Sequence, residues 1–279
     1  MRHDVAMTDQ GVYRRTSADG ADVEHFEPTG FTIGPWDDRL QHGGPVTALL
    51  TRAMDRLETP VDGRLGRLAI EIMRPVAMAT VRVESRVTRP GRRVALVEAR
   101  MLQQGRGGED VVVAMARGWR IATSDTTAAR HVPLETLAPP TDEEVNDPER
   151  SVPKMLDRGF VGGLDWVVRR PIGQPGAPSA AWARPPFELV EGEATTALER
   201  FAMVADSANG VGMRVDPTRW TFMNTDLTIH LHAQPRGEWV GLVAEATIGD
   251  DGVGTSAAIL HDEHGPVGRL AQVLLVEAR

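Results

Sequence analysis

The feature that most constrains the fold of this chain is an internal repeat, because the same order of elements occurs twice. In each half a segment with helical periodicity comes first, and four segments with strand character follow it. The helical segments are 42–55, which opens on His42, Gly43 and Gly44, and 195–208. A helix before an antiparallel run of strands is typical of an α+β unit. The sequence therefore predicts two tandem α+β units.

The strand segments are separated by turns that contain Gly or Pro. We expect them at 68–73, 80–88, 93–103 and 110–121 in the first half, and at 225–232, 239–248, 254–261 and 267–276 in the second. Leu102 and Leu260 stand at nearly the same separation as Arg117 and Gln272, which supports a duplication. Because Arg117 takes the place of Gln272 in the first copy, the two copies are expected to differ in function.

Composition places the boundary between the two units. Residues 123–155 are rich in Pro, Thr and acidic residues, which is typical of a linker. We expect an N-terminal unit at 21–122, a linker at 123–160 and a C-terminal unit at 161–279. Residues 1–20 lack the apolar core of a signal peptide, and we expect them to be a disordered lead.

The overall composition excludes several classes of function. The chain has 279 residues, 41% of them hydrophobic and 25% charged, which is usual for a globular protein. A net charge of −8 argues against a nucleic-acid-binding surface. Without cysteine there is no disulfide, thiolate nucleophile or Cys-based metal site. No apolar run is long enough to span a membrane, and we expect a cytoplasmic protein.

One polar residue stands in an apolar stripe of the last strand segment. Gln272 shares a strand face with Leu270, Leu274 and Val276, because side chains alternate between faces. A buried amide is costly unless it is hydrogen-bonded. Gln272 is therefore either tied to backbone or directed into a site.

Several short strings recur in a set order along the chain: Gly43-Gly44, Arg74-Pro75, Trp182-Ala-Arg184, Ala205-Asp206, Asn224 to His232, Asp262-x-x-Gly265 and Ala271-Gln272. None is specific alone, but their order and spacing resemble the acyl-CoA thioesterase II family. The resemblance covers about residues 20–279. It implies a double hotdog fold, in which each of two units wraps a curved antiparallel sheet around a central helix.

The resemblance also implies an activity and a set of catalytic residues. The family hydrolyses acyl-CoA to free acid and CoA, with no metal and no organic cofactor, and its double units pair into a homo-oligomer. Its catalytic set is an Asp on the second helix, a Thr or Ser near the start of the next strand, and a Gln on the last strand. Asp206, Asn224 and Gln272 match these positions. Asn224 departs from the pattern because it has no hydroxyl.

The residues themselves suit thioester hydrolysis. A carboxylate in an apolar helix can take a proton from water, and the Asn224 and Gln272 amides can orient that water. A backbone N–H of the second helix can polarise the thioester oxygen. His42, Gly43 and Gly44 are expected to bind substrate, with the glycines allowing close backbone approach.

Each of these residues also has a structural explanation. Asp206 can stabilise a helix end, His42 can cap a helix, and Asn224 can start a strand. Strict alternation places Asn224 on the polar strand face, so it reaches the site only if a bulge intervenes or regular strand geometry begins after it. His230 and His232 form a possible metal pair without an evident third ligand.

Two other functions compete with hydrolysis. An enoyl-CoA hydratase of the same fold needs an Asp and a His near the second helix, and the segment 206–211 contains no His. A non-catalytic acyl- or polyketide-binding protein would keep the fold without the chemistry, and Asn224 leaves that alternative open.

Overall fold

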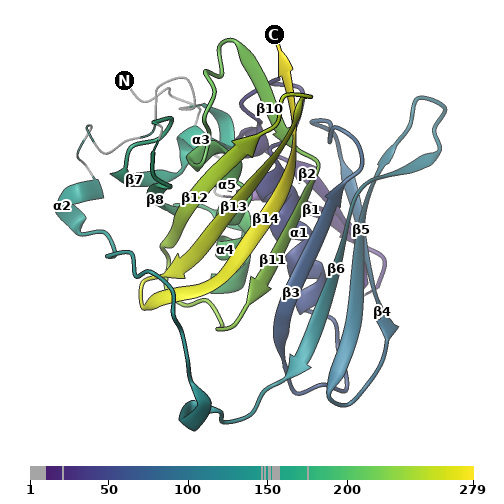
Figure 1. Cartoon of the computed structure of the whole chain (residues 1–279). Coiled ribbons are helices and arrows are strands. Elements are labelled where there is room, and N and C mark those ends of the chain that lie inside the picture. Colours follow the sequence, from purple (N-terminus) through teal and green to yellow (C-terminus); the bar gives the residue numbers. More distant parts are fainter. Residues whose placement is uncertain are drawn as a thin grey trace.

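The structure is a computed structural model of the chain, and it describes residues 11–20, 22–145, 147, 149, 152, 158–174 and 176–279. Figure 1 shows a broad curved sheet with the two long helices side by side on one of its faces. The N-terminal half forms the purple and blue part of this sheet, and the C-terminal half forms the green and yellow part.

Each half contains one long helix and a set of antiparallel strands. The N-terminal half comprises β1 (Gly11–Ala18), β2 (Val23–Pro28), the 3₁₀ helix η1 (Gly30–Thr32), α1 (Gly43–Asp55), β3 (Gly63–Ile72), β4 (Val81–Arg89), β5 (Val94–Gln104) and β6 (Asp110–Ala122). Two short helices, η2 (Thr127–Ala129) and α2 (Asp142–Val145), lie between the halves. The C-terminal half comprises α3 (Gly159–Gly163), β7 (Asp165–Arg170), β8 (Ser179–Arg184), β9 (Glu188–Val190), α4 (Ala197–Ala205), α5 (Ala208–Val211), β10 (Trp220–Asn224), β11 (Asp226–Leu231), β12 (Val240–Ile248), β13 (Val253–Asp262) and β14 (Gly265–Ala278).

The two halves join edge to edge into one sheet. Its 14 strands run in the order β7-β8-β12-β13-β14-β11-β3-β6-β5-β4-β2-β1-β9, with β10 paired to β14. The central junction is the antiparallel pair β3–β11, where Ile70 faces Leu227 and Leu68 faces Ile229. All four of these side chains are buried. The α+β architecture expected from the repeat is therefore confirmed, and the halves share one hydrophobic core.

Helices α1 and α4 pack closely because glycine opens α1. A Cβ atom on Gly44 would lie 2.3 Å from the carbonyl oxygen of Met203 in α4, so a larger residue does not fit without movement. Leu49 and Leu50 of α1 and Phe201 of α4 are buried. This close approach joins the two helices, and the binding of substrate at Gly43 and Gly44 stays a prediction.

The segment between the halves covers part of the opposite face of the sheet. The indole N–H of Trp182 donates to the carbonyl of Ala138 at 2.7 Å, and His261 Nε2 lies 2.7 Å from the carbonyl of Glu135. Leu137 packs with Trp182 and Trp239 in a second apolar cluster. The linker therefore contributes to the fold, although its sequence shows little helical or strand periodicity.

The expectation of a disordered lead through residue 20 is wrong for Gly11–Ala18. This segment forms β1, which pairs with β2 and, in parallel, with β9 of the other half. Val12 and Tyr13 are buried, and the Tyr13 hydroxyl donates to Gln41 Oε1 at 2.6 Å. The remaining β1 side chains are exposed, so the strand has little hydrophobic alternation. Residues 1–10 lie outside the described residues.

None of the helices in the described part of the chain is long and apolar enough to cross a membrane.

Candidate active site

Asp206 lies at the end of α4, where the helix meets the rest of the site. The helix starts at a capping box in which Thr196 and Glu199 satisfy each other's backbone N–H groups. It ends sooner than the expected 195–208, since Asp206 is its C-cap and the short helix α5 follows Ser207. The Asp206 side chain is buried, and burial raises the pKa of its carboxyl group. The charge of His42 and a hydrogen bond from Asn224 partly oppose that rise.

A bulge brings Asn224 to Asp206. Asn224 faces Leu274, and Thr228 faces Ala271. Three residues lie between Asn224 and Thr228, but only two lie between Ala271 and Leu274, so one residue is extra. The expected strand 225–232 corresponds to β11, and a separate strand, β10, precedes it with a break at Thr225. This break removes the alternation difficulty. Asn224 Nδ2 donates to Asp206 Oδ1 at 2.8 Å.

The side chain of Gln272 contacts the main chain of Asp206. The Gln272 side chain is buried, and its Nε2 donates to the main-chain carbonyl of Asp206 at 3.1 Å. Its Oε1 is buried and has no hydrogen-bond partner among the described residues. Gln272 lies beside the site residues but is not part of the described cavity wall.

The start of α1 faces Asp206 from the other half of the chain. His42 caps this helix, and its Nδ1 accepts the Gly44 N–H at 2.9 Å. The same nitrogen lies 3.5 Å from Asp206 Oδ2, and the ring packs on Phe160. Burial lowers the pKa of the imidazole, although the Asp206 charge opposes this. A Cβ on Gly43 would lie 2.5 Å from Asp206 Oδ2, so glycine is needed for the carboxylate to sit against the helix start.

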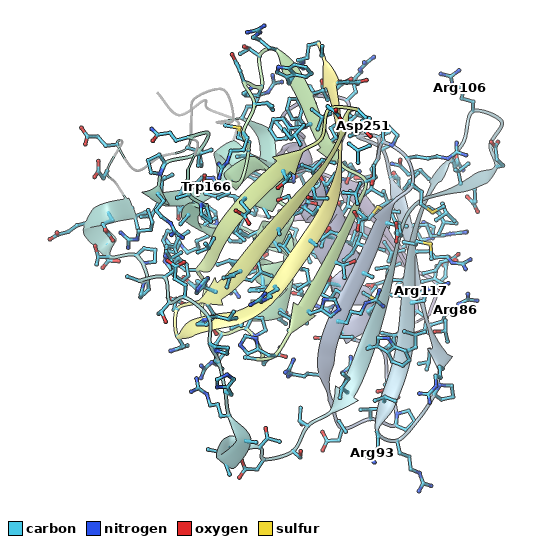
Figure 2. The ribbon with its side chains drawn as sticks, viewed as in Figure 1. Arg86, Arg93, Arg106, Arg117, Trp166 and Asp251 are labelled. Carbon is cyan, nitrogen blue, oxygen red and sulfur yellow. The ribbon has the colours of Figure 1, made fainter. Side chains whose placement is uncertain are left out.

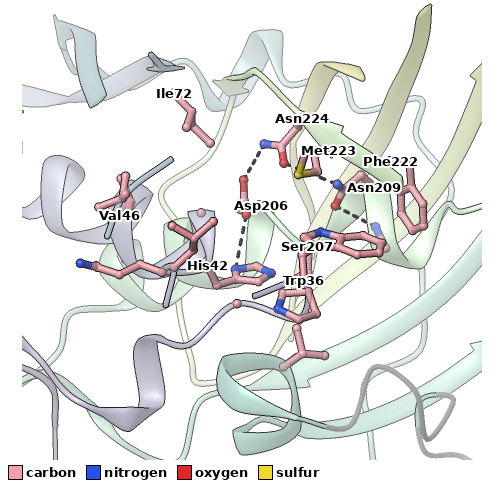
Figure 3. A pocket seen from close by; sticks show the side chains of 18 of the residues that line it. Trp36, His42, Val46, Ile72, Asp206, Ser207, Asn209, Phe222, Met223 and Asn224 are labelled. Carbon is pink, nitrogen blue, oxygen red and sulfur yellow. Dashed lines mark hydrogen bonds and ion pairs between the residues drawn. The ribbon is translucent and has the colours of Figure 1, made fainter. Parts of the chain in front are cut away.

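These groups border a cavity of about 360 Å³ between the two halves. Its wall is mostly apolar and includes Trp36, Val46, Ile72, Trp166, Val211 and Phe222. The polar side chains of His42, Asp206, Ser207, Asn209 and Asn224 also line it (Figure 3). A cavity with an apolar wall and a few converging polar groups is the usual form of a small-molecule site.

Sequence reasoning missed Asn209 as part of this site. Asn209 lies in α5, lines the cavity and donates from Nδ2 to Asn224 Oδ1 at 3.4 Å. Its own Oδ1 accepts the Gly210 N–H at 2.8 Å. The signal was present as a polar residue close after Asp206, but the contact depends on how β10 folds back.

Arg117 does not correspond to Gln272. The Arg117 side chain is on the exposed side of β6, whereas its neighbours Ala116 and Gly118 face the core. Arg117 forms an ion pair with Glu98 at 3.0 Å. Glu98 also pairs with Arg86 and Arg100. Figure 2 shows Arg117 and Arg86 near each other on the N-terminal part of the sheet. The match made from spacing was therefore wrong by strand parity.

A charged cluster occupies the corresponding place at the other end of the helix pair. Arg52 lies as far beyond the cap His42 as Asp206 lies beyond the cap Thr196. The Arg52 side chain is 1% exposed and pairs with Glu24 at 2.6 Å and Glu193 at 2.9 Å. A cation stands where the second copy has its carboxylate.

His230 in β11 and His232 just after it do not form a metal site with other described residues. The described residues contain no cluster of three or more His, Cys, Asp or Glu side chains that could hold a metal ion. His232 Nε2 instead lies 2.9 Å from the carbonyl of Pro266.

Solved structures resemble this fold over nearly its whole length. A conserved protein of unknown function with a hot dog fold from Alicyclobacillus acidocaldarius has a TM-score of 0.70 and 16% identity, covering 94% of this chain and 96% of that one. A putative thioesterase from Novosphingobium aromaticivorans has a TM-score of 0.70 and 16% identity, covering 95% and 98%. The acyl-CoA thioesterase II TesB2 from Mycobacterium marinum has a TM-score of 0.64 and 13% identity, covering 94% of each. The fold is therefore a double hotdog.

Family profiles match most of the sequence. The profile of the acyl-CoA thioesterase N-terminal domain matches residues 32–121, and that of the C-terminal domain matches residues 135–276. A search of curated protein sequences finds no significant match. The chain belongs to the acyl-CoA thioesterase family, with both of its domains in tandem.

Proposed function

We propose that this chain hydrolyses an acyl-CoA thioester to a free acid and CoA, with Asp206 as the general base. The observation that carries the proposal is a buried carboxylate held against the start of α1 at the centre of an apolar cavity. Burial raises the pKa of Asp206, which makes its carboxylate a better proton acceptor.

The contacts divide the work between the two carboxylate oxygens. Asn224 occupies Oδ1, so Oδ2 is the oxygen that accepts a proton from water. Both amide hydrogens of Asn224 are engaged, one with Asp206 Oδ1 and one with the carbonyl of Asp226 at 3.3 Å. Asn224 therefore acts on Asp206 rather than directly on the water. Gln272 fixes the main chain of Asp206 from the other side.

The reaction needs a donor for the thioester oxygen, and α1 supplies it. The first N–H groups of a helix have no partner within that helix, so the N–H of Gly43 is suited to a developing oxyanion. We therefore assign the donor to the first helix, whereas the sequence suggested a backbone N–H of the second helix. His42 and Gly44 hold that helix start in place.

Asp206 alone carries the proton from the attacking water to the leaving group. Water attacks the carbonyl carbon while Asp206 takes one proton, the carbon–sulfur bond then breaks, and the protonated carboxyl returns the proton to the departing thiolate. The products are the acid and the free thiol of CoA. The apolar cavity is suited to the acyl group.

A free-thiol assay across acyl-CoA chain lengths tests this proposal. The enzyme contributes no background thiol because it has no cysteine. We expect turnover with at least one acyl-CoA. Binding without thiol release would instead identify a non-catalytic acyl- or polyketide-binding protein.

A hydratase is the second candidate, because the structure supplies the missing histidine. The sequence has no His close after Asp206, but His42 from the first half lies 3.5 Å from it. Incubation with a short enoyl-CoA distinguishes the two reactions, since hydration removes the enoyl absorbance without releasing thiol.

The exposed face of the sheet suits assembly into a homo-oligomer. Val253, Val273 and Leu275 are exposed by 53%, 45% and 45% on adjacent positions of β13 and β14. We therefore extend the proposal to a dimer of double hotdogs, which light scattering coupled to size exclusion would measure.

A further inference from the structure

We propose that Asn209 is a positioning residue for the reaction, because its amide holds the Asn224 carboxamide in the orientation that donates to Asp206. The inference rests on the proposed function of Asp206. Three side chains form the series Asn209, Asn224, Asp206, drawn by dashed lines in Figure 3. Asn209 reaches the reaction only through Asn224.

A backbone N–H sets the orientation of the whole series. The Gly210 N–H can only donate, so the Asn209 atom 2.8 Å away must be its oxygen. The other atom of that amide is then Nδ2, a donor, and it faces Asn224 at 3.4 Å. Asn224 must present its oxygen there and its Nδ2 to Asp206. The 3.4 Å contact is long for a hydrogen bond, so its contribution is to orientation more than to binding energy.

An inverted Asn224 carboxamide would meet like atoms on every side. Its oxygen would face Asp206 Oδ1 and the carbonyl of Asp226, and its NH₂ group would face the NH₂ group of Asn209. The Asp226 carbonyl and Asn209 thus agree on the same orientation. Without Asn209, one of these two restraints is lost.

The orientation matters because Asp206 is buried with few partners. The hydrogen bond from Asn224 is one of two influences that lower the pKa of this carboxyl against the effect of burial. The other is His42, which faces it from α1. Two further charged residues, Asp37 and Arg74, line the same cavity. The Asp226 carboxylate is engaged elsewhere, because it accepts the Val273 N–H at 2.7 Å. A loosened Asn224 therefore leaves Asp206 harder to ionise.

The test is the pH dependence of kcat/KM for Asn209→Ala, measured in the wild-type and Asn224→Thr backgrounds. In the wild-type background we expect roughly a tenfold lower kcat and an acid limb moved to higher pH. A Thr hydroxyl rotates freely and needs no orienting partner. In the Asn224→Thr background, Asn209→Ala should therefore change kcat by less than about twofold. It should move the acid limb by less than about a tenth of a pH unit.

The outcomes separate this inference from the proposed function. Equal effects of Asn209→Ala in both backgrounds, or none in an active wild type, would overturn the positioning role. A wild type that releases no thiol would overturn the proposed function instead. Carboxyl NMR titration of Asp206 in wild type and Asn209→Ala needs neither turnover nor Asn224→Thr, and an unchanged pKa of Asp206 in Asn209→Ala contradicts the inference by itself.

Discussion

At the scale of single residues, the site is built around a buried carboxylate that has no arginine or lysine partner among the described residues. Asp206 contacts the amide of Asn224 and the imidazole of His42, and burial lowers the pKa of that imidazole. By contrast, the buried Glu98 pairs with three arginines. A buried carboxylate without a guanidinium partner costs stability when it is ionised. The fold maintains this cost at the position where the proposed hydrolysis needs a base.

Asp206→Asn is therefore expected to stabilise the protein at neutral pH. The folded-state pKa of Asp206 is raised above its unfolded value, so its contribution to stability is fully present below about pH 4 and is lost as the pH rises through the folded pKa. The neutral amide loses nothing over that range. Thermal melts should show a gain of at least about 2 °C at pH 7, closing near pH 4. A variant less stable than wild type at pH 7 would contradict this.

The residues of the site differ in how far the sequence could identify them. Asp206, Asn224 and Gln272 follow from the order of short strings, and the glycines follow from their place at a helix start. The contact of Asn224 with Asp206 required a bulge, and a bulge leaves no clear mark in hydrophobic alternation. The polar character of Asn209 close after Asp206 was visible in the sequence, but its contact with Asn224 was not, because that partner lies on another element.

At the scale of elements, the geometry of the site depends on the crossing of α1 and α4. The carbonyl of Met203 leaves no room for a side chain at position 44, and the Asp206 carboxylate leaves none at position 43. The long strands and both helices were predictable from periodicity. The strands β1, β2, β7, β9 and β10 were not assigned, since these segments are short or largely exposed and carry little alternation.

Gly44→Ala tests the crossing of the two helices. Its Cβ would overlap the Met203 carbonyl, a backbone atom that cannot rotate away, so we expect a loss of about 1–3 kcal/mol in the free energy of unfolding. Gly30→Ala is the matched control, because a Cβ there meets nothing within 4 Å. Urea denaturation of both variants measures the difference. Equal stability of the two would show that the helices tolerate a wider spacing.

At the scale of the whole molecule, the two equivalent places between the halves differ in the described residues, because one holds the carboxylate of Asp206 and the other holds Arg52. Asp206 comes from the second half, while His42 and Gly43 come from the first. At the corresponding place Arg52 is sealed by Glu24 and Glu193. The sequence indicated that the copies had diverged, but it located the difference at Arg117, because a spacing does not reveal which face of a strand a residue occupies.

We expect one substrate equivalent per chain. Titration with a non-hydrolysable acyl-CoA analogue by calorimetry should give a stoichiometry near one, since the Arg52 cluster fills the other position. A stoichiometry of two equal sites would mean that this cluster opens to ligand.

The halves are also expected to depend on each other for folding. Residues 161–279 alone would expose the edge of β11 and the buried face of α4, both of which the first half covers. We predict that this fragment is insoluble or aggregated. A soluble monomer with a cooperative melt would contradict the dependence.

The most direct test of the central claim is the rate of thiol release by wild type and by Asp206→Asn at neutral pH, with the best acyl-CoA substrate. The amide has the shape of the carboxylate and keeps an oxygen for Asn224, so the fold should persist, as the melts described above would verify. The account predicts that kcat falls by about 10²-fold or more, because the group that accepts the proton of water is gone. Turnover of the folded Asp206→Asn protein within a few-fold of wild type would contradict it.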